Sequence, residues 1–186
     1  MDDQMLVAEC KRGKPWAQKK LYELYAPVMM GICMRYASDR DTAQDILQDG
    51  FVKVFTKLDM YTGKGSLEGW MRRVFVTTAL EYLRQNNALK FSVSIDEYTE
   101  VVENVSVSAL DKLSADELMK CIEQLPSGYR TIFNLFAIEG YSHNEIAEIL
   151  NIQESTSRSQ FIRGRKLLQK IVLSQIMQED AKRQRG

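Results

Sequence analysis

The stretch from Leu125 to Leu168 constrains the fold of this chain more than any other. Gly140-Tyr141-Ser142 separates two helical segments, and Ser142 and Glu145 have the Ser-x-x-Glu spacing of a capping box. Ile146, Ala147 and Leu150 follow with the spacing of an apolar helix face. Asn151 comes next, and asparagine tolerates the left-handed backbone of a tight turn. The pattern predicts a helix-turn-helix with helices over about 142–150 and 154–176.

The second of these helices has an apolar side and a basic side. A turn of 100° per residue places five residues on the inward side: Ser157, Phe161, Gly164, Leu168 and Ile171. The candidate DNA contacts on the remaining surface are Ser155, Arg158, Ser159, Ile162, Arg163, Arg165, Lys166 and Lys170. Arginine can bond guanine, serine can bond several base edges, and lysine anchors phosphate. A charged outer face is usually only solvated, but the single sign of charge and the preceding capped helix favour DNA binding.

The rest of the chain shows helical periodicity with almost no strand alternation, which predicts an all-α fold. Further helices are expected over about 3–11, 14–25, 27–37, 39–58, 66–88, 110–124 and 127–138. Residues 90–112 carry two basic and five acidic residues, whereas the flanking segments are faintly basic. We therefore expect two small helical domains, 1–89 and 113–186, joined by an acidic flexible linker over 90–112.

The residues that could carry chemistry are few. Cys10, Cys33 and Cys121 form no CxxC pair and His143 is the single histidine, which predicts no metal site and a reducing cytoplasm. The first residues lack a signal-peptide pattern, and the longest apolar run, around Val28 to Met34, is too short to cross a bilayer. No phosphate loop or nucleophile constellation is present. We expect a cytoplasmic protein with no membrane insertion, no cofactor, no catalytic residues and no enzymatic activity.

The run from Asp41 to Phe55 is the most distinctive part of the first half. Its apolar positions cluster on one helical side and are expected in the core: Leu47, Gly50, Phe51, Val54 and, just beyond the run, Leu58. Asp45, Gln48, Asp49 and Val52 cluster on the opposite side. This acidic face is either an ordinary solvated surface, which periodicity alone favours, or a docking surface for a basic partner.

A glycine-rich loop, Asp59 to Ser66, precedes the next helix. It carries Tyr61 and Lys64, and one side of the helix carries Trp70, Arg73, Thr77 and Arg84. Cations beside aromatic rings can hold single-stranded nucleic acid by charge and base stacking, although such rings more often belong to a core.

In this order and spacing, the motifs resemble those of bacterial RNA polymerase sigma factors of the extracytoplasmic-function group. The first-half motifs are the run from Asp41 to Phe51, Gly69-Trp70-Met71, and Glu81-Tyr82-Leu83-Arg84. Those of the second half are Leu125-Pro126 to Arg130, Gly140-Tyr141-Ser142, Glu145-Ile146-Ala147, Thr156, Ser159 and Arg163-Gly164-Arg165.

Several positions depart from the family pattern. Thr77 replaces the usual asparagine, and Glu81 replaces aspartate. Gln153 replaces a serine N-cap, so Ser155 is expected to cap the helix instead. Ser157 replaces a core valine, which should loosen the turn or require a hydroxyl bond back to a carbonyl. His143 is expected to be an exposed helix residue.

The resemblance implies a role for each surface. Asp45, Gln48, Asp49 and Val52 would dock on the clamp of core RNA polymerase. The loop 59–66 and the helix Trp70–Arg84 would capture and melt the −10 promoter element, and the helix-turn-helix would read the −35 element. An anti-sigma factor is the further expected partner, beside core polymerase and promoter DNA. The acidic linker would thread near the polymerase active-site cleft, or would be a solvated tether.

One alternative from another class remains. A DNA-binding regulator with a helical partner-sensing N-terminal domain would occupy a promoter without core polymerase. The runs Asp41–Phe55 and Trp70–Arg84 count against it.

Overall fold

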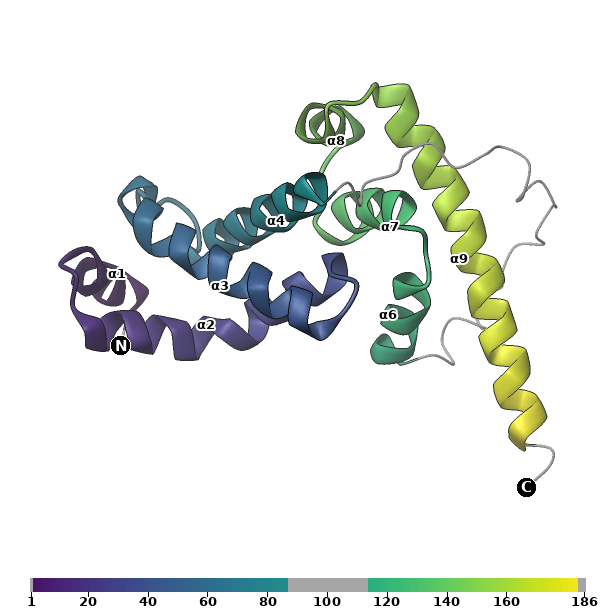
Figure 1. Ribbon diagram of the computed structural model, residues 1–186, viewed down its shortest axis with the longest axis horizontal. Helices are drawn as coiled ribbons and strands as arrows, with labels where there is room; N and C mark the ends of the chain where they lie inside the picture. Colours follow the sequence, from purple (N-terminus) through teal and green to yellow (C-terminus); the bar gives the residue numbers. More distant parts are fainter. Residues whose placement is uncertain (1, 87–113, 184–186) are drawn as a thin grey trace. The chain divides into compact units, whose positions relative to one another are not determined.

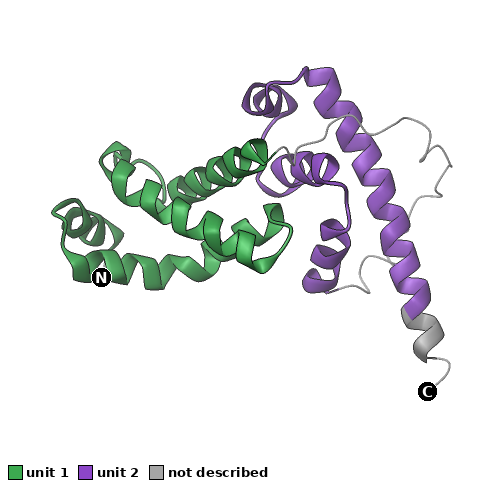
Figure 2. Cartoon of the chain, in the orientation of Figure 1, with its two compact units in different colours: residues 1–88 green, residues 89–186 purple. Residues whose placement is uncertain are grey.

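The computed structural model describes residues 2–86 and 114–183, and it divides the chain into two compact units, Met1–Ala88 and Leu89–Gly186 (Figures 1 and 2). The described residues form helices and no strand, which confirms the all-α prediction. The expected linker, 90–112, lies outside the described residues.

Unit 1 is built on three helices that pack against one another. They are α2 (Pro15–Tyr36), α3 (Arg40–Lys57) and α4 (Leu67–Gln85); α1 (Asp3–Lys11) covers α2, and the short 3-10 helix η1 (Leu58–Met60) follows α3 (Figure 1). Their fully buried side chains include Leu21, Met29, Ile32, Ile46, Met71 and Phe75. Phe51 lies among aromatic neighbours, with ring centroids 4.6 Å from Tyr22 and 5.2 Å from Phe75.

The predicted break at Pro27 is wrong. A single helix, α2, runs through it, where separate helices over 14–25 and 27–37 were expected. Proline lacks a backbone N–H and costs about 3 kcal/mol in a helix interior. The helix continues because Leu21 lies on one side of the proline, Met29 and Ile32 lie on the other, and all three are fully buried. Tertiary burial outweighs the local penalty here.

Gly50 sets the distance between α3 and α4. A Cβ atom at this position would lie well inside van der Waals contact with the ring of Phe75, which is itself fully buried. Gly31, in the middle of α2, has no heavy atom within 4 Å of a Cβ added in the same way. Gly50 and Gly31 therefore differ in packing, and of these two glycines only Gly50 permits a close approach of another helix.

Gly50→Ala is expected to destabilise unit 1 by about 1–3 kcal/mol, because the Phe75 ring must shift within a packed core. Gly31→Ala is the matched control and should stabilise it by up to about 1 kcal/mol, through helix propensity. Trp16 and Trp70 are the chain's two tryptophans and both lie in unit 1, so their fluorescence in urea reports on that unit. Equal changes for the two variants would contradict the close approach.

Unit 2 contains α6 (Ala115–Glu123), α7 (Ser127–Phe133), the π-helical segment η3 (Asn134–Ile138), α8 (His143–Leu150) and α9 (Glu154–Arg183). The single helix predicted over 127–138 is instead α7 followed by the π-helical segment η3. Helix α9 extends to Arg183, beyond its predicted end at about residue 176. The core beneath α6, α7 and α9 consists of Cys121, Ile122, Leu125, Tyr129, Leu168 and Val172.

The three cysteines are buried and none forms a disulfide. Within residues 2–86 and 114–183, no helix combines the length and the apolar character that crossing a membrane would need.

Candidate nucleic-acid and protein interfaces

The start of α3 is fixed by Asp39. Its carboxylate accepts a bond from the Thr42 backbone N–H at 2.8 Å, and also bonds the Thr42 hydroxyl at 3.1 Å and the Ser38 hydroxyl at 2.8 Å. The Thr42 N–H, followed by the Ser38 hydroxyl, lowers the pKa of Asp39. A capped first turn sets the rotation of α3, and so determines which residues face solvent.

The residues Asp45, Gln48, Asp49 and Val52, which we call the α3 face, are all exposed. Ile46, Leu47 and Val54 on the opposite side of the helix are buried. Val52 is 61% exposed, an unusual fraction for valine in a helix whose other apolar residues are buried or partly buried. The α3 face therefore combines two carboxylates with an exposed aliphatic side chain, which suits a partner carrying basic and apolar groups.

The placement of Tyr61 does not agree with a base-stacking role. Its side chain is only 8% exposed, and its hydroxyl donates to the Gly65 carbonyl at 2.8 Å. Its ring lies 5.6 Å from that of Trp70, and its carbonyl accepts a bond from Lys11 Nζ at 3.2 Å. Tyr61 therefore stabilises the conformation of the loop from its buried side. The loop itself turns at Gly63 and Gly65, both of which have positive φ.

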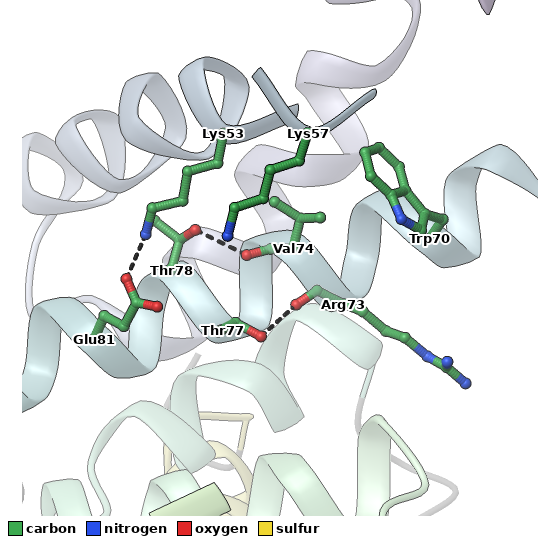
Figure 3. A pocket seen from close by; sticks show the side chains of 8 residues that line it. All are labelled: Lys53, Lys57, Trp70, Arg73, Val74, Thr77, Thr78 and Glu81. Carbon is green, nitrogen blue, oxygen red and sulfur yellow. Dashed lines mark hydrogen bonds and ion pairs between the residues drawn. The ribbon is translucent and has the colours of Figure 1, made fainter. Parts of the chain in front are cut away.

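The remaining predicted −10 residues lie on the surface of the loop and of α4. Lys64, Arg73, Thr77 and Arg84 are exposed, and Trp70 is half-buried. A cavity of about 210 Å³ opens between α3 and α4 (Figure 3), lined by Lys53, Lys57, Trp70, Arg73, Val74, Thr77, Thr78 and Glu81. The sequence interpretation did not include Lys53 or Lys57 among the site residues, because only the packing of α3 on α4 brings them to this surface.

The helix-turn-helix forms as predicted. Ser142 accepts a bond from the Glu145 N–H, and the Glu145 carboxylate bonds back to the Ser142 N–H at 2.8 Å. Asn151 adopts the left-handed conformation with φ of 54°. Ser155 does not cap α9: the helix begins at Glu154, and the Gln153 carbonyl accepts the bond from the Ser157 N–H at 3.1 Å.

The basic side of α9 faces solvent along its first half. Ser155, Arg158, Ile162, Arg165 and Lys166 are exposed, whereas Ser159, Arg163 and Lys170 are partly buried. The inward side is formed by Ser157, Gln160, Gly164, Leu168 and Val172. Phe161 and Ile171, both predicted inward, are only partly buried. A Cβ on Gly164 would lie 3.2 Å from that of Tyr129, so this glycine permits close packing of α9 on α7.

Arg158 and Glu154 form an ion pair along the exposed surface of α9. Because the pair is solvent-exposed and spans one helical turn, it contributes little to the stability of α9.

His143 lies in α8, as expected, but is partly buried rather than exposed, and the Ser157 hydroxyl bonds a side chain rather than a carbonyl. The Ser157 hydroxyl bonds Nδ1 of His143 at 2.9 Å, and not a carbonyl. The imidazole is partly buried, because it stacks on Phe136 with ring centroids 4.2 Å apart and lies 5.8 Å from Phe161. Desolvation by burial, with nearby Arg158, lowers the pKa of His143, while Glu154 opposes this shift. When the neutral imidazole carries its proton on Nε2, Nδ1 can accept a hydrogen bond from the Ser157 hydroxyl. This bond links α8 to α9.

His143→Phe is expected to destabilise unit 2 by about 1–3 kcal/mol, because it keeps the stacking on Phe136 but leaves the buried Ser157 hydroxyl without its partner. Adding Ser157→Ala should restore most of that loss, since it removes the stranded hydroxyl. Hydrogen exchange of the α8 and α9 amides in the full chain measures both changes. No recovery in the double variant would show that the hydrogen bond does not link the two helices.

Comparison with known proteins finds a matching family model for each of the two units. The model of the Sigma-70 region 2 family matches residues 21–89, and that of Sigma-70, region 4 matches residues 115–168. The ECF RNA polymerase sigma-E factor of Haemophilus influenzae is 27% identical over 181 residues, covering 91% of this chain and 94% of that protein. The RNA polymerase sigma-H factor of Pseudomonas aeruginosa is 28% identical over 179 residues, covering 90% and 92%.

Two solved structures share the fold. CnrH, solved in complex with the cytosolic domain of CnrY, is 18% identical with a TM-score of 0.50, over 92% of this chain and 97% of that chain. RpoE of Bartonella quintana, solved with the anti-sigma factor NepR, is 21% identical with a TM-score of 0.51, over 83% and 95%. Models of Sigma-70 region 2 and region 4 match successive parts of the chain, and relatives named as extracytoplasmic-function sigma factors match nearly all of it. The chain therefore belongs to the sigma-70 family, in the extracytoplasmic-function group of factors that direct RNA polymerase to promoters.

Proposed function

We propose that this sigma factor binds core RNA polymerase through the α3 face, reads the −35 promoter element with α9, and recognises and melts the −10 element with the 59–66 loop and α4. The observation that carries the proposal is the two-sided character of α9. Its outer side exposes Arg158, Ile162, Arg165 and Lys166, while its inner side packs on α7 and α8 behind a capped helix and a left-handed turn. This is the arrangement by which helix-turn-helix proteins place a helix in the major groove.

The −35 contacts divide into two kinds. Ser155, Arg158, Ser159, Ile162 and Arg163 lie in the N-terminal part of α9, which usually meets base edges. Arg165, Lys166 and Lys170 lie further along and are better placed to follow phosphates.

The −10 contacts come from Lys64, Trp70, Arg73, Thr77 and Arg84. Tyr61 is removed from this set, because its buried ring supports Trp70 and the loop.

Trp70→Ala is expected to reduce open-complex formation without changing binding to a duplex −35 element, because base stacking on an aromatic ring contributes about 1–3 kcal/mol per base. Permanganate reactivity of −10 thymines in the reconstituted holoenzyme measures melting. A folded variant with unchanged reactivity would exclude Trp70 from strand capture, and a general loss of unit 1 structure would assign it to the core.

The proposed partners are core RNA polymerase, promoter DNA and an anti-sigma factor. Bartonella quintana RpoE, which shares this fold, was crystallised with the anti-sigma factor NepR. An anti-sigma factor of this chain would cover its polymerase-binding and promoter-binding surfaces.

Affinity capture with core polymerase, followed by run-off transcription, tests the proposal. We expect the chain to co-purify with core and to give promoter-dependent transcripts that core alone does not produce. Promoter occupancy by the free chain without association with core would instead indicate a stand-alone regulator.

A further inference from the structure

The turn between α1 and α2 is strongly basic. Residues 11–20 hold five basic residues and no acidic one. Gly13 turns the chain with a φ of 70°, and Pro15 begins α2. Arg12 pairs with Glu9 at 2.6 Å. Four exposed residues of this segment, which we call the α1–α2 corner, combine positive charge with an aromatic ring: Lys14, Trp16, Lys19 and Lys20.

Trp16 is exposed, although tryptophan is usually among the more buried residues. The residue is 50% exposed, and its ring forms no aromatic pair with another described residue. Lys19 and Lys20 follow it by three and four positions, so they lie on the same side of α2. Ala17 and Leu21, on the inward side, are fully buried. An exposed ring beside cations is the arrangement that binds single strands, by base stacking and by charge.

The cations of the corner are available to an anion. Among the residues that the structure describes, the side-chain amines of Lys14 and Lys20 have no hydrogen-bond or ion-pair partner. Lys19 meets Glu23 at 3.9 Å, in an exposed pair that spans one helical turn and contributes little. Two lysines at least can therefore bind phosphate without first losing another contact.

The corner lies at the end of unit 1 that carries the 59–66 loop (Figure 1). Lys11, the last residue of α1, donates from Nζ to the Tyr61 carbonyl at 3.2 Å, and α1 also packs on η1. Tyr61 in turn bonds Gly65 and lies beside Trp70. The segment that forms the corner is thus joined to the loop, and a strand captured by the loop has the corner as a neighbouring cationic surface.

We propose that the α1–α2 corner binds the non-template strand of promoter DNA next to the −10 element. This inference rests on the proposed −10 function and extends the strand contact beyond the 59–66 loop and α4. Trp16 stacks on an unpaired base, and Lys14 and Lys20 contact phosphates of the same strand. The corner precedes residues 21–89, which the region 2 family model matches. An acidic protein surface would also attract the lysines, but the exposed ring and the link to the loop favour DNA.

The test uses holoenzyme assembled from the full chain and core polymerase, with the non-template strand of a promoter that the run-off assay identifies. One single-stranded probe contains the −10 element alone, and two others extend it by about eight thymidines on the 5′ or the 3′ side. We expect one extension to strengthen wild-type binding by about tenfold.

Trp16→Ala should reduce this extension gain to about twofold or less and leave binding of the short probe unchanged, because only the stacking contact beyond the −10 element is lost. Trp16→Phe keeps an aromatic ring and should keep most of the gain. The matched control is Leu24→Ala, which truncates another α2 residue that is 50% exposed, and it should keep the whole gain.

Lys14→Ala combined with Lys20→Ala tests the phosphate contacts. This variant should reduce the salt slope for the extended probe by about 1.4, because each phosphate contact on a single strand contributes about 0.7. Arg40→Ala combined with Lys120→Ala removes the same charge from exposed positions outside the corner, and should keep the wild-type slope.

The outcomes separate this inference from the function on which it rests. An extension gain that survives in Trp16→Ala and in the double-lysine variant would overturn the inference alone, as would the absence of any gain in wild type. Variants that lose affinity for core polymerase while keeping the gain would make the corner a protein contact and also overturn it. Wild-type holoenzyme that binds the short probe no better than a scrambled sequence would overturn the −10 proposal itself.

Discussion

Asp45→Arg combined with Asp49→Arg is expected to abolish association with core RNA polymerase while leaving unit 1 folded. Both carboxylates are exposed on the α3 face, and neither forms an ion pair or side-chain hydrogen bond with a described residue. The fold should therefore change by no more than about 0.5 kcal/mol per substitution. If the partner surface is basic, each charge reversal replaces an attraction by a repulsion. This costs several kcal/mol of binding free energy and slows the association of the chain with core polymerase. We expect core binding to weaken by at least about a hundredfold.

The control must carry the same change of charge elsewhere on unit 1. Asp2→Arg combined with Glu23→Arg meets this need, because both residues are exposed and lie on or beside α1 and α2. Affinity for core measured at two salt concentrations separates local contact from general charge. If both double variants lose core equally, net charge governs binding and the α3 face has no special role. If the α3 variant binds core normally, docking occurs elsewhere. A third variant, Val52→Asp, tests the apolar centre of the same face.

Arg158→Ala combined with Arg163→Ala is expected to cost about 2–6 kcal/mol on the preferred −35 sequence, if two base contacts of about 1–3 kcal/mol each are lost. The loss should depend on sequence, because an arginine contact to a guanine edge disappears only where the guanine was present. Arg158 is exposed and held only by its surface pair with Glu154. Arg163 is partly buried, which restricts its side chain and favours a defined contact.

Arg165→Ala combined with Lys166→Ala is the matched control. It also removes two positive charges from α9, and both residues are exposed. This variant should weaken binding to all sequences alike and reduce the salt slope by about two units, because each phosphate contact contributes about 0.9. Binding of full-length variants to a −35 duplex library at two salt concentrations distinguishes the pairs. Indistinguishable profiles would make all four residues backbone contacts, and base reading would then fall to Ser155, Ser159 or Ile162.

Local sequence determined the helix-turn-helix. The capping box at Ser142 and Glu145 and the left-handed turn at Asn151 involve neighbours a few residues apart, so they could be predicted from residue types alone. The same holds for the α3 face, because helical periodicity separates Asp45, Gln48, Asp49 and Val52 from the buried side of one helix.

The tertiary structure decided what depends on contacts between helices. Pro27 lies inside α2 because residues on both sides of it are buried in the unit 1 core. Tyr61 is buried against Trp70, and His143 reaches Ser157 across fourteen positions of the chain. Lys53 on α3 pairs with Glu81 on α4 at a cavity whose walls belong to both helices. A periodic pattern reports only which side of its own helix a residue occupies, and these pairs were set by how the helices pack against one another.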